Sequence, residues 1–463
     1  MTPVKPPLSP VCLPPRFATL LAIGGALSLA IHLGNGGFEV VAVVLLGAAF
    51  ALTLMLVSQG HPPAVPAWLK GHGILVAGIA LQYLVLLVSK PGIYLDTSLV
   101  ALWPFRALVL VSALVAGDFL RRQASGSGRW HFVLLLSLHG AIGCWVIAAS
   151  PSPSIDVYAF HVEAFGAAAR GLDPYAITMP DIYGHDAFYG PGLLVDGRLN
   201  VGFPYPPLSF HLARLGHLLG DYRYATTAAI VGTAALIHAF RPGPASALAA
   251  LAFLSIPRTP FVIEQGWTDP FVGFFLAITI LLAIRGSVLL FIPLGLLFAI
   301  KHYMVIGAPL VLLLVGSSGP GWIGHLRRGA AVLVGAVAVA ALVTLPMALL
   351  HPRAVVFDLI GFQANQPFRS DSLSFLAAFY QATGLTPPLW LGFASIPPAL
   401  VLGWRRLPRS PSGFAQGLLL VYLAFFAFGK QAFCNYYFFV AGCAFIAAGA
   451  LEPASPQHSA QRI

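Results

Sequence analysis

The stretch VVAVVLLGAAFALTLMLV at residues 40–57 contains no charged side chain. It is long enough to cross a hydrocarbon core of about 30 Å as an α-helix. Similar apolar runs recur along the whole chain of 463 residues. Hydrophobic residues make up 58% of the chain and charged residues only 9%, whereas an ordinary soluble domain carries about 25% charged residues. This composition excludes a soluble enzyme, a disordered tail and a fibrous protein. It predicts an all-α, polytopic bundle of transmembrane helices.

The apolar runs predict about 12–14 membrane crossings. The predicted crossing segments are 17–33, 38–57, 72–89, 97–117, 131–150, 222–240, 244–256, 270–285, 287–300, 303–316, 329–350, 387–404, 413–428 and 434–450. Because 244–256, 287–300 and 303–316 are short, we expect two or more of them to be re-entrant or broken. The predicted divisions are N-terminal helices at 1–130, a core at 131–316 with a long outer loop at 151–221, and C-terminal helices at 317–463 with a second outer loop at 351–388.

The formal net charge of +10 comes from 25 basic and 15 acidic residues. In a soluble protein this balance would suggest nucleic-acid binding, but the basic residues of a membrane protein gather in its cytoplasmic loops. With the N-terminus inside, the arginine pairs at 121–122, 327–328 and 405–406 all fall on the cytoplasmic side. We therefore predict no nucleic-acid partner, and we place both long loops on the outer face of the membrane.

Cysteine usage and short motifs predict no metal site. The four cysteines, Cys12, Cys144, Cys434 and Cys443, have neither metal-ligand spacing nor the pattern of a disulfide framework. The chain has no His-Glu-x-x-His pattern, no P-loop and no strand-linked glycine fingerprint. The lack of the last two argues against a nucleotide-sugar substrate.

The first long loop opens with SIDVYAFHVEAF at residues 154–165. Its apolar positions recur at helical spacing: Ile155, Tyr158, Val162 and Phe165. Asp156 and Glu163 share the opposite face, two turns apart, so we expect an amphipathic helix at the outer interface. Asp156 falls in the first turn, where the helix dipole favours an ionised carboxylate that can accept a proton. The sequence equally allows Asp156 to serve only as a partner of the dipole.

Two lysines lie within or beside later apolar runs. A charge at membrane depth costs about 2.5–3.5 kcal/mol on insertion scales, so Lys301 and Lys430 need a partner, a wet cavity or a route for snorkelling to the headgroups. Under the predicted topology both reach the same side as Asp156, Asp269 and Arg369. Cations that face carboxylates at one membrane surface suit an anionic lipid-phosphate substrate.

Several motifs together resemble a known family: Asp156-Val157-Tyr158, Gly171-Leu172-Asp173-Pro174-Tyr175, Phe203-Pro204-Tyr205-Pro206-Pro207-Leu208-Ser209, Lys301-His302-Tyr303, Gln366-Pro367-Phe368-Arg369 and Lys430-Gln431-Ala432-Phe433-Cys434-Asn435-Tyr436-Tyr437. The chain resembles the GT-C superfamily of integral-membrane glycosyltransferases. Within it, residues 131–450 are most similar to bacterial polyprenyl-phosphate-mannose-dependent (family 87-like) mannosyltransferases.

This resemblance implies an inverting transfer of a hexose, with mannose expected, from a polyprenyl-phosphate donor to an envelope lipid or glycan acceptor. It implies a multi-pass protein of the bacterial inner (plasma) membrane, in contact with membrane lipids, with its active site on the outer face. Asp156 takes the place of the family's loop carboxylate, the general base, and Glu163 is the second catalytic candidate. Many superfamily members have two nearly adjacent carboxylates there, so the two-turn separation leaves open whether Mg²⁺ or Mn²⁺ is used. No cofactor is required by the expected chemistry, and the oligomeric state is not assigned.

Two further sets of residues complete the predicted site. From electrostatics we assign the donor phosphate to Lys301, Arg369 and Lys430. The expected substrate-binding residues are Tyr158, His302, Gln366, Gln431, Asn435 and Tyr436.

Two other functions compete with sugar transfer. A membrane transporter or lipid-linked-sugar flippase would place ionisable residues near mid-membrane on paired broken helices. A structural or assembly subunit of an envelope complex would need no aligned carboxylate and cations. The polar residues concentrate instead in two outer loops and at outer helix ends, which favours the transferase.

Overall fold

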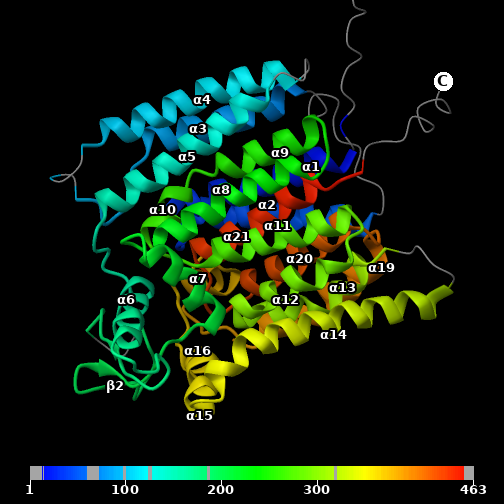
Figure 1. Ribbon diagram of the computed structural model, residues 1–463. Coiled ribbons are helices and arrows are strands. Elements are labelled where there is room, and N and C mark those ends of the chain that lie inside the picture. Colours follow the sequence, from blue (N-terminus) through cyan, green and yellow to red (C-terminus); the bar gives the residue numbers. More distant parts are fainter. Residues whose placement is uncertain are drawn as a thin grey trace, which may run out of the picture.

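The computed structural model describes residues 13, 15–59, 72–96, 98, 101–123, 128–184, 188–316 and 321–452. Within these ranges it is a bundle of helices with three very short strands (Figure 1). Five helices are long and apolar enough to cross a membrane, and seven further apolar helices have 10–17 residues. The chain is therefore a polytopic, all-α membrane protein, as predicted. Cys12 and residues 97, 99 and 100 of the predicted run 97–117 lie outside the described residues.

Each predicted apolar run overlaps one or more helices of the described chain. The helices of the bundle are α1 (Pro15–His32), α2 (Val40–Ser58), α3 (His72–Val88), α4 (Trp103–Gln123), α5 (Arg129–Ala149), α8 (Arg223–Ala239), α9 (Pro244–Leu254), α10 (Thr259–Glu264), α11 (Asp269–Ile284), α12 (Phe291–Ile300), α13 (Val311–Leu314), α14 (Gly321–Ala348), α18 (Leu391–Ala394), α19 (Ile396–Arg406), α20 (Pro411–Ala427) and α21 (Cys434–Gly449). Short 3₁₀ segments at Leu33–Gly36 (η1), Val288–Leu290 (η3) and His302–Leu310 (η4) join some of them.

The centre of the bundle combines helices from both ends of the chain. Helix α1 packs against α2 and α21, and α21 packs in turn against α9 and α20. The contact between α1 and α21 is close, since a Cβ added at Gly24 would lie 2.5 Å from the ring of Phe445. Helix α14, by contrast, packs mainly on α12 and has almost no buried residues. The first and last predicted divisions of the chain thus share one core, while the division itself stays a prediction.

One of the three short apolar segments, 303–316, is irregular, whereas two or more were expected to be re-entrant or broken. Helix α12 ends at Ile300, and Lys301 has an extended backbone with φ −135° and ψ 132°. The chain continues as the 3₁₀ helix η4, which contains Pro309, before the brief helix α13. Proline lacks an amide hydrogen and fixes φ, which disfavours regular α-helix through this segment. The break places Lys301 between two helical segments rather than on the side of a continuous helix.

The two long loops gather at one end of the bundle (Figure 1). They contain α6 (Asp156–Ala169), α7 (Pro207–His217), α15 (Pro352–Val356), the π-helical turn η5 (Phe357–Gly361), α16 (Phe362–Asn365) and α17 (Phe375–Thr383). Strands β1 (Met179–Pro180), β2 (Leu194–Val195) and β3 (Arg198–Leu199) form an antiparallel sheet in the order β1-β3-β2, with Leu199 opposite both Met179 and Leu194.

The apolar face predicted for α6 needs correction. The helix begins at Asp156 as expected, but Val162 is 44% exposed, whereas Phe160 and His161 are fully buried. The buried face carries rings that pack within the loop itself: His161 stacks on Tyr205 and Tyr222 at centroid distances of 5.3 and 4.6 Å. Ring packing inside the protein therefore covers the buried face of α6.

Candidate active site

Asp156 stands at the first residue of α6. Its Oδ1 accepts a hydrogen bond of 2.7 Å from the Val157 amide, and its own amide nitrogen lies 3.5 Å from the Tyr183 hydroxyl. Burial raises the pKa of the Asp156 carboxyl, although the bonds from Val157 and Tyr183 and the charge of Arg369 oppose this shift. A carboxylate with a raised pKa is a better proton acceptor near neutral pH than an ordinary aspartate. The position of Asp156 thus suits a general base. The bond from the Val157 amide also fits a carboxylate that serves only as a partner of the helix dipole.

Tyr205 connects Asp156 with the predicted cation Lys301. Burial first, and then the charge of Asp156, raise the pKa of the Tyr205 phenol, and Asp269 also contributes to this rise. The Lys301 ammonium lies 4.9 Å from the centroid of the Tyr205 ring, an arrangement in which a cation is attracted to an aromatic face. The Tyr205 carbonyl accepts a hydrogen bond of 2.6 Å from the Tyr175 hydroxyl, which holds this part of the loop in place.

Lys301 has a carboxylate partner, Asp269, at the first turn of α11. Their Nζ and Oδ2 atoms are 3.3 Å apart. Asp269 also accepts hydrogen bonds of 2.7 Å from the Tyr303 hydroxyl and 3.1 Å from the Asn435 amide nitrogen. Both charged residues are almost completely buried, at 1% and 5% exposure. The predicted site residues Lys301 and Asn435, far apart in sequence, thus meet at one carboxylate.

The predicted residues of the second loop meet those of the α20–α21 junction. The Lys430 ammonium donates to the carbonyls of Ala364 and Gln366 at 2.9 and 2.6 Å, and the side-chain amide of Gln431 donates to that of Gln366. The Arg369 amide donates to the Lys430 carbonyl at 3.0 Å. Burial lowers the pKa of the Lys430 ammonium. Four predicted site residues therefore form one cluster, which lies within electrostatic reach of Asp156 through Arg369.

The Arg369 guanidinium makes its own local contacts. It pairs with Asp371 through two bonds of 2.8 and 2.6 Å, and it lies 4.4 Å from the ring centroid of Phe188 and 5.0 Å from that of Phe433. A guanidinium held flat between rings has little freedom to turn. Any phosphate bound here would therefore meet a cation of fixed orientation.

Two residues predicted for the site have other partners. The Glu163 carboxylate lies 3.1 Å from the Arg198 guanidinium in a largely exposed pair on the strand side of α6. The Tyr158 hydroxyl donates to the Pro151 carbonyl at 3.0 Å, and its ring is covered by the Arg223 guanidinium at 4.9 Å. The remaining two predicted residues pack around Tyr303, with centroid distances of 5.7 Å from His302 and 6.0 Å from Tyr436.

Arg223 is an important residue that the sequence interpretation missed. Its side chain is fully buried and pairs with Asp221, with Nη2 2.6 Å from Oδ2. It also donates to the carbonyls of Ser150 at 2.7 Å and Glu264 at 3.2 Å. These contacts join the end of α5, the end of α10 and, through Tyr158, the helix that begins at Asp156. The pattern Asp-x-Arg at the start of an apolar run was the available signal.

Asp358 is the second missed residue, and it joins the two long loops. It lies in the π-helical turn η5, a feature frequent at functional sites, and its Oδ1 accepts a hydrogen bond of 2.9 Å from the Gly202 amide. A Cβ added at Gly202 would lie 2.3 Å from Asp358 Oδ2, so a larger residue does not fit there. Nearby, His351 Nδ1 lies 2.6 Å from Asp173 Oδ2. Burial raises the pKa of the Asp358 carboxyl to about 7.

This pKa predicts a pH-dependent stability. Because the pKa of Asp358 is higher in the folded chain than its ordinary value of 3.8, the folded state holds the proton over the interval between the two values. The free energy of unfolding is therefore expected to fall as pH rises through this interval, by at most about 1.4 kcal/mol per pH unit. Thermal unfolding in detergent should show this slope in the wild type and a weaker one in Asp358→Asn, with the exposed Asp196→Asn as control. An unchanged slope in Asp358→Asn would assign the pH dependence to other groups.

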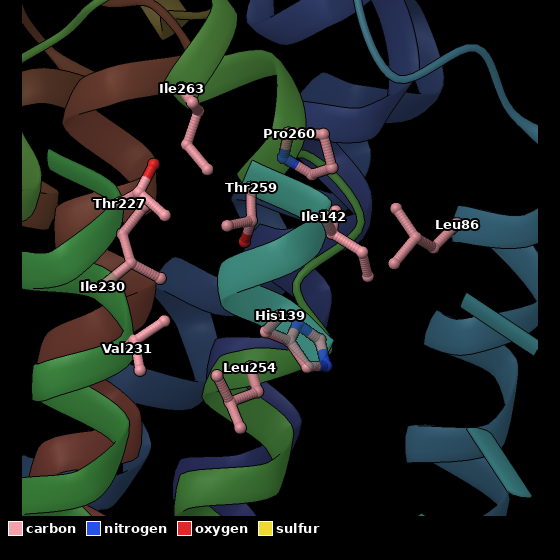
Figure 2. Close-up of a pocket in the computed structure, with 10 residues that line it drawn as sticks. All are labelled: Leu86, His139, Ile142, Thr227, Ile230, Val231, Leu254, Thr259, Pro260 and Ile263. Atoms are coloured by element: carbon pink, nitrogen blue, oxygen red, sulfur yellow. The ribbon is translucent and has the colours of Figure 1, made fainter. Parts of the chain in front are cut away.

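Two cavities among the described residues lie apart from this site. The first, of about 10 Å³, lies between α5, α8, α9 and α10, with Leu86 of α3 beside it (Figure 2). The second, of about 420 Å³, lies between the start of α5 and the end of α8, and is lined by residues such as Arg129 and His238. The first is far too small for a sugar, since ligand sites enclose about 300–1,000 Å³. Because neither contains Asp156, Lys301 or Lys430, the common chamber expected around these residues stays a prediction.

The described residues offer no evident metal-binding cluster. Within the described ranges, no group of three His, Cys, Asp and Glu side chains is arranged to hold a metal ion. Asp156 has tyrosines and Arg369 among its neighbours, and Asp269 has Lys301.

Comparisons with known proteins give two distant structural likenesses. No protein-family model matches the chain, and no curated protein matches it. The chain is similar to the crystal structure of ArnT from Cupriavidus metallidurans bound to undecaprenyl phosphate, with 17% identity, a TM-score of 0.43, and coverage of 72% of this chain and 62% of that chain. It is also similar to the apo structure of the same ArnT, with 19% identity, a TM-score of 0.36, and coverage of 65% and 60%. The chain thus matches about three fifths of the length of these proteins, and likenesses this distant assign it no family.

Proposed function

We propose that this chain is an integral-membrane glycosyltransferase of the GT-C type. It moves a hexose, with mannose as the expected sugar, from a polyprenyl-phosphate donor to an envelope lipid or glycan on the outer face of the bacterial inner membrane. The observation that supports this proposal best is the grouping of Asp156, Lys301, Arg369 and Lys430. These residues come from distant parts of the chain and lie at one end of the helical bundle, around Tyr205 and the α20–α21 junction.

The reaction needs one base and a stabilised leaving group. The acceptor hydroxyl oxygen attacks the anomeric carbon of the donor sugar and forms the new glycosidic bond while the bond from that carbon to the phosphate oxygen breaks. Asp156 takes the hydroxyl proton, and its raised pKa suits this transfer. Polyprenyl phosphate leaves with the bonding electrons. Because the attack comes from the face opposite the leaving group, the configuration inverts.

Among the predicted phosphate ligands, Lys430 has contacts that leave its charge least compensated. In the described structure its ammonium is held by two neutral carbonyls, whereas Lys301 faces Asp269 and Arg369 faces Asp371. A cation fixed by dipoles keeps its charge available for an incoming anion. We therefore assign Lys430 the largest share of the phosphate binding.

This assignment predicts the effect of Lys430→Ala. A hydrogen bond to a charged group contributes about 1.5–3 kcal/mol, so the donor KM is expected to rise by about 10- to 100-fold with a smaller change in kcat. Titration of purified protein with polyprenyl-phosphate mannose measures both constants. Lys90→Ala removes an exposed lysine and is expected to leave them unchanged. A wild-type donor titration in Lys430→Ala would reject the role.

Direct product analysis tests the function as a whole. Purified protein in detergent is incubated with synthetic polyprenyl-phosphate mannose, glucose or arabinose and a bacterial lipid extract, and products are identified by mass spectrometry. We expect release of polyprenyl phosphate and a mannosylated product, with less or none from the other donors. If glucose or arabinose is transferred instead, the assignment of mannose as the donor sugar is wrong. If none of the three sugars is transferred, the proposal is rejected.

One feature also fits a transporter or flippase. The buried pair of Lys301 and Asp269 lies at a broken helix, and such breaks carry ion and substrate sites in transporters. Reconstituted vesicles distinguish the two functions. Movement of labelled polyprenyl-phosphate mannose between leaflets without a new glycoside would support the transporter.

A further inference from the structure

We infer that Asp269 is a positioning residue that holds the Lys301 ammonium towards Tyr205, where the donor phosphate is bound. This inference rests on the proposed function, because it assumes that Lys301 binds the phosphate. The inference adds Asp269 to the predicted site. It also explains why a charged residue, Lys301, is buried at the break between α12 and η4.

The carboxylate of Asp269 is held by side chains from two other parts of the fold, the start of η4 and the start of α21. Oδ1 accepts from the Tyr303 hydroxyl of η4 at 2.7 Å, and Oδ2 accepts from the Asn435 amide of α21 at 3.1 Å. Oδ2 also faces Lys301 Nζ at 3.3 Å. Asp269 itself is the first residue of α11, where the helix dipole stabilises an anion. A carboxylate held in this way cannot follow a mobile lysine, so it defines where the ammonium lies.

The contact leaves Lys301 able to bind a second anion. An ammonium has three donors, and its separation of 3.3 Å from Asp269 exceeds the usual 2.7–2.9 Å of a charge-assisted bond. The same nitrogen lies 4.9 Å from the Tyr205 centroid, and Tyr205 is the residue that senses the charge of Asp156. An incoming phosphate oxygen at this point would meet Lys301 on one side and have the general base within electrostatic reach.

The pair also gives Lys301, which is 5% exposed, an anionic partner. Burial without a counter-ion disfavours the protonated amine and lowers its affinity for a proton. The titratable and charged groups that face Lys301 are Asp269 and His302 from the core, Tyr205 from the first loop, and His161 from α6. Burial, followed by the charge of Lys301, holds the pKa of His161 at about 3, so this histidine is neutral. Asp269 is thus the anion that compensates Lys301.

The test measures binding of polyprenyl phosphate to the purified full-length protein across pH. The wild type gives the reference profile of binding between pH 6 and 8.5, a range in which titration of the phosphate itself affects all variants alike. In Asp269→Asn we expect at least about tenfold weaker binding. We also expect a new loss of binding as pH rises through this range, because the uncompensated lysine gives up its proton. If the role of Asp269 were purely structural, its replacement would not make phosphate binding fall with rising pH.

Two further variants make the result specific. Adding Lys301→Arg to Asp269→Asn should remove the new pH dependence, because a guanidinium stays protonated when buried. Tyr303→Phe removes one hydrogen bond from Asp269 but no charge, so it should weaken binding without a pH effect. If Asp269→Asn does not fold, as judged by size-exclusion chromatography, Asp269→Glu replaces it. This variant keeps the charge and displaces the carboxylate, so binding should weaken at all pH values.

The outcomes separate this inference from the proposed function. If Lys301→Ala binds polyprenyl phosphate as the wild type does, Lys301 is no phosphate ligand and the premise fails. If Lys301→Ala weakens binding while Asp269→Asn and Asp269→Glu behave as the wild type across pH, the phosphate role stands and the positioning role of Asp269 is wrong.

Discussion

Replacing Asp156 with asparagine is expected to lower kcat for sugar transfer by about 10²- to 10⁴-fold, the usual contribution of a general base. Asparagine has nearly the same shape and its carbonyl oxygen can still accept from the Val157 amide, which donates to Asp156 at 2.7 Å. The start of α6 should therefore be preserved while the proton acceptor is lost. Single-turnover assays with saturating polyprenyl-phosphate mannose measure the chemical step directly.

Two neighbouring carboxylates sharpen this experiment. Asp196→Asn makes the same chemical change in an exposed turn with φ 50°, a conformation that asparagine tolerates, and should leave kcat unchanged. Glu163→Gln tests the second predicted carboxylate, which pairs with Arg198. If Glu163→Gln rather than Asp156→Asn loses turnover, the base is Glu163. If both retain it, neither residue is the base.

Replacing Arg223 with methionine is expected to cost about 3–5 kcal/mol in the free energy of unfolding, as is typical when one partner of a buried ion pair is removed. The change leaves Asp221 without its cation, and it strips a donor from the carbonyls of Ser150 and Glu264. Thermal unfolding in detergent measures the loss. Because Arg223 also covers Tyr158 near the start of α6, activity should fall in any folded fraction.

An exposed ion pair in the first long loop supplies the control. Arg198→Met removes the partner of Glu163, and both side chains of that pair are about one third or more exposed. Exposed pairs contribute about 0–1 kcal/mol, so this variant should unfold almost as the wild type does. Equal losses in the two variants would mean that burial of Arg223 does not determine its contribution.

Local sequence information was enough to predict the helices and the position of Asp156. Charge-free runs define helices in a membrane because backbone groups must find their hydrogen bonds within the segment. The break near Lys301 was also foreseeable, because the runs on either side of it are short and a proline follows at residue 309. The start of α6 at Asp156 agrees with the helical spacing that follows it. These features depend on neighbours in sequence, which a single chain displays directly.

Partners of charged groups could not be predicted in the same way. Asp358 meets Gly202 across 156 positions and Asp269 meets Asn435 across 166, and no local pattern fixes such contacts. The orientation predicted for α6 was wrong in part, because Val162 is exposed and a ring stack around His161 covers the buried face. Tyr158 was one of the expected substrate-binding residues. Its actual neighbours, Pro151 and Arg223, became evident only when the loop was seen folded.

Because of the length of helix α14, the depth of the second long loop depends on the thickness of the bilayer. Its 28 residues extend about 42 Å at 1.5 Å per residue, which exceeds the roughly 30 Å of a hydrocarbon core. It must therefore tilt strongly or carry its end turns into the headgroup layer. Since α15 and the turn with Asp358 follow directly after α14, thinner or thicker bilayers would change how deeply these elements sit relative to the lipid surface.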